Sequence, residues 1–235
     1  LLGYYDTEFW LPNGDNYTVR VTTSLVGGSF IEAAAGSSAS GTIGPTDVFI
    51  DNAINSHPNN DKLVEVLLGQ PSGIAPQFVY VRFTRTANGA TGRVDGWSQQ
   101  APLVVFADHV DNTMTINDLA TGNNVLGIGS YCSKRAWIDN NENPQTDANC
   151  TPALLGDISF FSSRGPTRPT GADPGRVKPE LAAPGERVAA ALSANISGDP
   201  ESPTNIARSG RPRLIKGPSM APPVVTGLAA LIKAR

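Results

Sequence analysis

Gly217-Pro218-Ser219-Met220-Ala221-Pro222-Pro223-Val224-Val225-Thr226-Gly227 leads directly into the last apolar segment of the 235-residue chain. From Met220 to Ile232, apolar residues recur mainly at three- and four-residue spacings, and small residues fill the other positions. This pattern predicts a helix buried on nearly all sides, as the central helix of a domain would be. At the start of such a helix, Ser219 has a backbone N–H with no acceptor inside the helix.

Ser219 has two interpretations at this position. A serine at a helix start is most often a helix cap, which stabilises the helix by about 1 kcal/mol. The same position suits an acyl-transfer nucleophile, because the N–H of the serine and the positive end of the helix dipole can stabilise an oxyanion. The position of the serine alone favours the cap.

The residues around Ser219 reverse that preference. The pattern Gly217-x-Ser219-Met220-Ala221-x-Pro223-x-Val225-x-Gly227 closely resembles the nucleophile motif of the subtilisin-like serine proteases, the subtilases. Three further segments resemble motifs of that family and occur in the family's order. They are 124–130 (Asn-Val-Leu-Gly-Ile-Gly-Ser), 161–167 (Phe-Ser-Ser-Arg-Gly-Pro-Thr) and 178–185 (Lys-Pro-Glu-Leu-Ala-Ala-Pro-Gly). The resemblance covers roughly residues 119 to 235.

The resemblance implies a secreted serine endopeptidase of the α/β class, of which this chain holds the C-terminal part of a parallel-sheet catalytic domain. Ser219 would attack the scissile carbonyl of a polypeptide substrate and form an acyl-enzyme. The family's Asp and His motifs precede its serine, and neither occurs in residues 1–235. We therefore expect the Asp, the His and an Asn oxyanion donor to lie upstream of residue 1. This chain alone should be almost inert, because a serine needs an oriented base.

The chain has two histidines, and both offer a weaker alternative. His57 stands in a turn-like sequence, and His109 follows Asp108 near the end of a predicted strand. A triad of Asp108, His109 and Ser219 is conceivable, but adjacent residues rarely project to one point. Two surface histidines without a catalytic role are the preferred interpretation.

Two prolines depart from the family motif. Pro218 stands where the family has Thr, and it removes a hydroxyl and a backbone N–H beside the oxyanion site. Pro222 replaces a small residue, and each proline disfavours helical backbone at the residue before it. The sequence therefore predicts a stiff turn and a displaced Ser219. A non-catalytic relative of the family is the corresponding alternative.

The first half of the chain has the pattern of strands. Apolar and polar residues alternate over 17–22, and further candidates are 47–54, 62–68, 78–84, 93–97 and 103–106. The Gly-, Ala- and Ser-rich stretch 27–44 is expected to be a loop or a sheet edge. Short strands without a long helix between them predict an antiparallel β-sandwich, jelly-roll-like in form.

The composition pattern changes near residue 120. The apolar run 125–129 is typical of a strand buried on both faces of a parallel sheet. The predicted domains are 1–118, a β-sandwich, and 119–235, the C-terminal part of the catalytic domain. The resemblance to large bacterial subtilases that carry a β-sandwich at this place implies that 1–118 is inserted in the catalytic domain. The alternative is that the sandwich is a binding or adhesion module that recognises a polypeptide or a surface glycan.

Cys132 and Cys150, the two cysteines of the chain, flank a polar stretch. This arrangement favours one disulfide and an extracellular location, and closing such a loop stabilises by about 3 kcal/mol. No zinc-type Cys/His spacing occurs. Calcium is a further candidate ligand of this stretch, although a solvated loop is the preferred interpretation. The side chains that offer oxygen ligands are Asp139, Asn140, Asn141, Glu142 and Asp147.

The charge and hydropathy of the chain exclude two classes of partner. The formal net charge is −3 and no basic block occurs, so the sequence gives no electrostatic basis for binding nucleic acid or an anionic membrane. The longest apolar run, 224–232, is far shorter than the roughly 20 residues that span a bilayer. A polypeptide substrate and the missing part of the catalytic domain are the expected partners.

Overall fold

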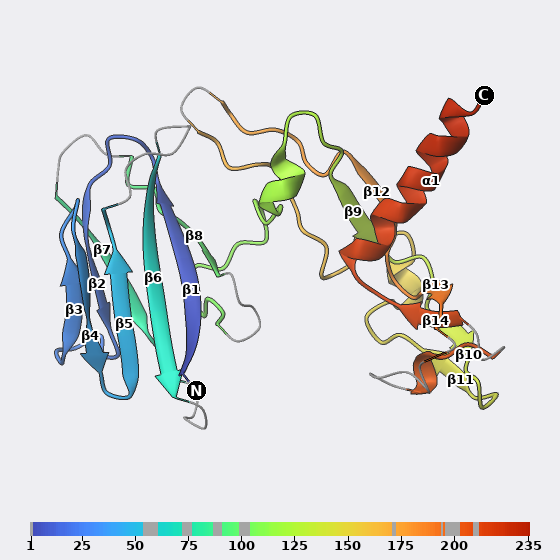
Figure 1. Cartoon of the computed structure of the whole chain (residues 1–235), viewed down its shortest axis with the longest axis horizontal. Coiled ribbons are helices and arrows are strands. Elements are labelled where there is room, and N and C mark those ends of the chain that lie inside the picture. The colour runs from blue at the N-terminus through green and yellow to red at the C-terminus, as the bar shows by residue number, and fades with distance from the viewer. Residues whose placement is uncertain are drawn as a thin grey trace. The chain divides into compact units, whose positions relative to one another are not determined.

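A computed structural model describes residues 2–53, 61–71, 77–86, 91–98, 104–170, 173–193, 195, 203–208 and 212–235. The chain forms two compact units (Figure 1). The sandwich unit comprises Leu1–Val110 with Thr170–Pro174, and the C-terminal unit comprises Asp111–Pro169 with Gly175–Arg235. The division at 110/111 precedes the expected domain boundary at 118/119, and 170–174 return to the first unit.

Eight described strands build the sandwich unit, and they form two antiparallel sheets. The first sheet has the order β4-β5-β6-β1-β8, and the second has the order β3-β2-β7. The strands are β1 (Leu2–Leu11), β2 (Tyr17–Thr22), β3 (Phe30–Ala33), β4 (Ser38–Ile43), β5 (Thr46–Asp51), β6 (Lys62–Pro71), β7 (Tyr80–Arg85) and β8 (Asp95–Ser98).

The core of this unit lies between the two sheets. Val19 and Val21 of β2 and Val64 and Val66 of β6 have no exposed surface, because alternate residues of a strand face the same side. Both sheets contribute to one apolar cluster, which comprises Phe9, Leu11, Tyr17, Val19, Val21, Ala33, Ile43, Val48, Ile50, Val64 and Val66. The described strands thus form the predicted antiparallel sandwich.

Strand prediction was accurate where alternation was strong. The predicted 17–22 coincides with β2, and β5, β6, β7 and β8 begin within two residues of their predicted starts. The stretch 27–44 contains β3 and β4, which are edge strands of the two sheets, as the edge interpretation expected. β1 was missed. The prediction of a strand at 103–106 was wrong for its described part, because 104–106 form no strand.

The C-terminal unit contains one parallel pair among its described strands. β9 (Ile128–Tyr131) and β12 (Leu181–Pro184) run parallel, with Leu181 opposite Ile128 and Pro184 opposite Tyr131. Two antiparallel pairs accompany it, β10 (Ala136–Ile138) with β11 (Pro144–Thr146), and β13 (Val188–Ala191) with β14 (Pro212–Ile215). The short 3-10 helices are η1 (Asp118–Thr121), η2 (Pro152–Leu154), η3 (Pro203–Asn205) and η4 (Pro218–Met220). The predicted parallel-sheet α/β class is therefore not confirmed beyond the β9–β12 pair.

The apolar run before β9 is more exposed than predicted. Val125 and Leu126 have 45% and 61% of their surface exposed, and the strand begins only at Ile128. Burial on both faces was therefore wrong for the first half of the run, which serves as the approach to the strand.

The predicted final helix exists as α1 (Ala221–Lys233), and it lies beside β9 and β12 (Figure 1). The prediction that it is buried on nearly all sides was wrong. Of its residues only Ala221 is buried, while Leu228 and Leu231 are 58% and 71% exposed. A helix is buried all round only where a second layer covers it, and the described residues supply contacts from one side.

Cys132 and Cys150 form the predicted disulfide, with Cα atoms 5.8 Å apart. Both residues are buried, and the loop that they close carries the β10–β11 hairpin. None of the described helices combines the length and the apolar character that a membrane crossing requires.

Candidate functional site

Ser219 lies in the single 3-10 turn η4, directly before α1. Met220 donates its backbone N–H to the carbonyl of Gly217 at 3.0 Å, and Ala221 donates to the carbonyl of Pro218. These two bonds fix the turn, and the Ser219 side chain within it is exposed. The serine is therefore accessible to a ligand.

The polar groups of Ser219 are not used for local structure. Met220 is the N-cap of α1, and no side chain caps the helix. Within the described part of the chain, neither the N–H nor the hydroxyl of Ser219 has a hydrogen-bond partner. The helix-cap interpretation is thus not supported, and the N–H is available to an external acceptor.

Two glycines attach the serine turn to the end of the parallel pair. Gly217 donates its N–H to the carbonyl of Gly185 at 2.9 Å, and Gly185 donates to the carbonyl of Tyr131 at 3.3 Å. A Cβ on Gly185 would collide with the Ser130 hydroxyl, so the approach requires glycine there. Gly217 has φ 151° and ψ 157°, a conformation that is essentially restricted to glycine. Both glycines lie in motifs that the sequence shows, but the hydrogen bond between them could not be predicted from the sequence.

The prolines of the motif are accommodated in the first turn of α1. Pro222 and Pro223 stand where helical N–H groups lack partners in any case, so little hydrogen bonding is lost. Ala221 has helical φ −74° and ψ −44° although a proline follows it. The packing of this buried alanine outweighs the local preference against helical backbone.

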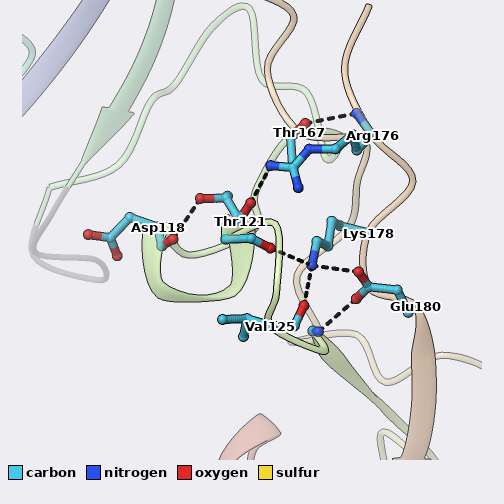
Figure 2. A network of polar contacts seen from close by, with 9 residues as sticks. Asp118, Thr121, Val125, Thr167, Arg176, Lys178 and Glu180 are labelled. Atoms are coloured by element: carbon cyan, nitrogen blue, oxygen red, sulfur yellow. Dashed lines mark hydrogen bonds and ion pairs between the residues drawn. The ribbon is translucent and has the colours of Figure 1, made fainter. Parts of the chain in front are cut away.

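The 178–185 segment is anchored by a buried lysine (Figure 2). Lys178 donates from Nζ to the carbonyls of Gly122 at 3.2 Å and Val125 at 2.6 Å, and it pairs with Glu180 Oε1 at 2.5 Å. The other oxygen of Glu180 accepts the N–H of Gly127 at 2.7 Å. The Lys178 hydrogen bond is the main reason why the pKa of Glu180 lies below its ordinary value. These contacts hold the approach to β9 against the start of β12.

A second set of contacts extends the same attachment to η1. Arg176 donates its backbone N–H to Thr167 Oγ1 at 2.9 Å, and its guanidinium donates to the carbonyl of Thr121 (Figure 2). Thr121 in turn donates its hydroxyl to the carbonyl of Asp118 at 2.6 Å. The motif segments at 161–167 and 178–185 therefore position backbone around the parallel pair.

The buried carboxylate of Asp147 links the loop closed by the disulfide to Lys216, which lies just before the serine turn. Asp147 Oδ2 accepts from Arg187 Nε at 2.6 Å and lies 3.8 Å from Lys216 Nζ. Arg187 also donates to Asn205 Oδ1 at 2.7 Å and stacks 4.7 Å from the centre of the Trp137 ring. Burial alone would raise the pKa of Asp147, but the bond from Arg187, the N–H of Asn149 and the nearby cations together hold this pKa below its ordinary value. Sequence analysis missed this network, because its members are distant along the chain.

The histidines do not complete a described site with Ser219. His109 and Asp108 have side chains that are 96% and 91% exposed, and His109 Nε2 lies 3.9 Å from Asp108 Oδ2. Both belong to the sandwich unit, whereas Ser219 belongs to the C-terminal unit. His57 lies outside the described residues. The alternative triad of Asp108, His109 and Ser219 stays a prediction.

The acids proposed for calcium have protein partners. Asp139 accepts the N–H groups of Asn141 and Asn143 at 2.9 Å each and the Gln145 amide at 2.8 Å. Asp147 is bound to Arg187, and Glu142 pairs with Arg208 at 3.0 Å. Among the described side chains, Asp6, Glu8 and Glu65 lie close enough together to hold a metal, whereas Cys132 and Cys150 beside Glu186 do not qualify because they form the disulfide. Neither group includes the loop acids, and calcium binding there stays a prediction.

Known proteins share both parts of this architecture. The solved structure of the CspB protease of Clostridium perfringens resembles this chain with a TM-score of 0.61 and 21% identity. The likeness covers 97% of this chain and 40% of that one, and it concerns the fold.

Curated relatives match shorter stretches of the chain. The subtilisin-like protease SBT3.10 of Arabidopsis thaliana is 32% identical over 102 residues, which are 41% of this chain and 12% of that protein. The subtilisin-like protease SBT3.3 of the same plant is 40% identical over 74 residues, or 32% of this chain and 8% of that protein. The chain thus spans a small part of the length of these relatives.

The family model supports the same relation over a longer stretch. The model of the subtilase family matches residues 69–235, which begins inside β6 and includes the serine turn and α1. The match therefore starts well before the motif region at 119–235 and takes in β7 and β8 of the sandwich unit. More than half of the chain is covered, and the chain belongs to the subtilase family.

Proposed function

We propose that this chain is part of a serine endopeptidase in which Ser219 is the nucleophile. The observation that carries the proposal is the accessible serine with a vacant N–H at the start of α1. Attack of Ser219 Oγ on a peptide carbonyl forms a tetrahedral intermediate, and its oxyanion accepts the N–H of Ser219 itself. Collapse of the intermediate releases the amine and leaves an acyl-enzyme, which water then hydrolyses.

The serine turn has the rigidity that this chemistry requires. Gly217 is tied to Gly185, and Gly185 is tied to Tyr131 at the end of β9. A misplacement of about 1 Å can reduce a rate by on the order of 100-fold, so a nucleophile benefits from such an anchor. The bond from Lys178 to the Val125 carbonyl holds the segment before β12, and the bond from Arg187 to Asp147 holds the segment after β12.

The general base and its carboxylate are assigned to polypeptide beyond residues 1–235. The His109 side chain is 96% exposed, so it lacks the packing that orients a catalytic base. The curated relatives are several times longer than the matched stretch, which leaves room for an Asp and a His motif. Exposed apolar residues on α1, with Leu231 71% exposed, suit the docking of that missing part. The disulfide favours an extracellular location.

Pro218 supports a second candidate, a non-catalytic member of the family. It provides no N–H beside the oxyanion site, so stabilisation there relies on Ser219 and on a donor from elsewhere. The retained turn and the vacant Ser219 N–H favour the active enzyme over this alternative.

The two candidates are separated by labelling the longest natural form of the protein with a fluorophosphonate probe. Only an activated serine reacts, so we expect labelling of the wild type and none of Ser219→Ala. Ser193→Ala, at another exposed serine of the same unit, is the matched control and should be labelled normally. Peptide hydrolysis should fall by on the order of 10⁶ in kcat for Ser219→Ala, the size of loss known for a relative in this family. Labelling that survives in Ser219→Ala, or is absent from the wild type, would refute the assignment.

A further inference from the structure

The outer face of the β4-β5-β6-β1-β8 sheet contains a hollow between two exposed aromatic rings. Its volume is about 270 Å³, and its lining includes Tyr4, Ser40, Thr42, Asp47 and Phe49. Tyr4 and Phe49 are 59% and 38% exposed, so both rings are accessible to a ligand.

Strand register explains how the hollow forms. Tyr4 of β1 stands opposite Gly69 of β6, Gly69 stands opposite Asp47 of β5, and Asp47 stands opposite Thr42 of β4. A Cβ on Gly69 would lie 2.8 Å from the Tyr4 ring and 3.3 Å from Asp47, so the ring lies over the glycine. The Tyr4 ring therefore occupies the place that a side chain at position 69 would fill, and this brings the ring close to Asp47 at the wall of the hollow.

Asp47 places a negative charge at the wall of the hollow. Its Oδ1 accepts the Thr42 hydroxyl at 2.8 Å. Within the described residues, its Oδ2 has no hydrogen-bond partner. An aromatic face and a carboxylate oxygen on either side of one space suit a Lys or Arg side chain, which stacks its cation on the ring and pairs with the acid.

The rest of the outer face of this sheet is also negatively charged. Alternation along the strands directs Thr7, Phe9 and Leu11 inward, where they are buried, and their neighbours outward. The acidic face is defined here by its outward carboxylates, which are Asp6, Glu8, Asp47, Asp51, Glu65 and Asp95. None of the described outward positions of these five strands is Lys or Arg, although Arg93, just before β8, pairs with Asp95 at 2.7 Å. The opposite sheet instead sets Arg20 directly against Arg82.

The carboxylates of β1 and β6 are crowded. Glu8 stands directly opposite Glu65, and like charges in this position destabilise a sheet. Oxygens of Asp6, Glu8 and Glu65 lie within 4.8 Å of one another. Burial and the charge of Glu8 both raise the pKa of Asp6. A cationic ligand is attracted to this concentration of negative charge, whereas a neutral sugar is not.

We propose that the acidic face binds an extended polypeptide segment rich in Lys and Arg, with one cationic side chain in the hollow between Tyr4, Asp47 and Phe49. A neutral glycan can stack on the aromatic rings and donate hydroxyl hydrogen bonds to the carboxylates, but it leaves their negative charge uncompensated, and the cationic peptide therefore fits more of the face. This inference is independent of the chemistry of Ser219, so either can fail without the other.

The test measures binding of a fluorescein-labelled octalysine peptide to the purified 235-residue chain by fluorescence anisotropy. The triple variant Asp47→Asn, Asp51→Asn, Glu65→Gln should weaken binding at least tenfold, and Tyr4→Ala should weaken it about threefold. Asparagine at 47 and 51 keeps the acceptor oxygens for Thr42 and Ala53, so the fold should persist, which circular dichroism checks. Binding should weaken as salt increases.

The matched control neutralises three acids that are not on the acidic face, Asp108→Asn, Asp111→Asn and Glu142→Gln. It changes the net charge equally and should bind octalysine as the wild type does. Equal weakening in both triple variants would show a general charge effect and overturn the proposal. So would Tyr4-dependent binding of maltohexaose without octalysine binding, or a self-association in sedimentation that the triple variant abolishes.

Discussion

Gly217 donates its backbone N–H to the carbonyl of Gly185, and this 2.9 Å bond joins the serine turn to the end of β12. Both residues need to be glycine for different reasons. Gly217 has a φ of 151°, while a Cβ on Gly185 would collide with Ser130 and lie 3.1 Å from the Gly217 carbonyl. The position of Ser219 therefore depends on an interaction between two motifs.

Gly185→Ala should displace the serine turn. The new methyl group meets the Ser130 hydroxyl and the Gly217 carbonyl, so we expect the free energy of unfolding to fall by about 1–3 kcal/mol. Fluorophosphonate labelling of the longest natural form should slow by on the order of 100-fold. Urea unfolding and labelling rates measure the two effects.

Gly227→Ala is the matched control for that substitution. Gly227 lies inside α1, and a Cβ there has no atom within 4 Å. Alanine should therefore raise helix stability by about 0.5–1 kcal/mol and leave labelling unchanged. If Gly185→Ala behaved like Gly227→Ala, the anchoring role of Gly185 would be wrong.

Acid should loosen the attachment of β12 through Glu180. Its pKa in the folded chain is below the ordinary value of 4.5, mainly because of the hydrogen bond from Lys178. A lowered pKa means that Glu180 stabilises the fold fully above about pH 4.5 and that this contribution is lost as the pH falls through the folded value. Urea midpoints measured from pH 7 to pH 3 should decline more steeply for the wild type than for Glu180→Gln. Parallel curves would contradict the assignment.

The serine turn could be predicted because its signal is local. Gly217, Ser219 and Pro223 stand within one short stretch, and so do the apolar spacings of α1. The β2 strand was equally clear, since its alternation directly encodes one buried face. The disulfide followed from the presence of two cysteines around one loop.

The contacts that position the site could not be predicted from the same signals. Asp147, Arg187 and Lys216 meet only after three separate loops have folded, and nothing in their spacing indicates this. The burial of α1 was wrong for a related reason, because periodicity shows which side chains are apolar but not whether a layer covers them. The sequence predicts only a loop or a sheet edge where β4 lies. Ser, Ala and Gly have little strand propensity, and this strand depends on its pairing with β5.

Loss of the disulfide should destabilise the C-terminal unit. The bond links residues 18 positions apart, and a loop of this size stabilises by about 3 kcal/mol. The loop also carries Asp147, so its release should weaken the contacts to Arg187 and Lys216. Calorimetry of Cys132→Ser with Cys150→Ser should show a lower melting temperature than the wild type, and a thiol reductant should lower it only in the wild type. An unchanged melting temperature in the double variant would contradict this expectation.

Removal of the Glu186 carboxylate should stabilise the fold. Glu186 is 1% exposed, and neither of its side-chain oxygens has a hydrogen-bond partner within the described residues. Leaving a buried polar group without a partner costs about 1–3 kcal/mol, so Glu186→Met should raise the free energy of unfolding by a similar amount. Glu142→Gln, at a 69% exposed side chain, is the control and should change it by less than about 0.5 kcal/mol. A decrease in stability of Glu186→Met in urea unfolding would show that the carboxylate is bound by a group that compensates its burial, and would refute this prediction.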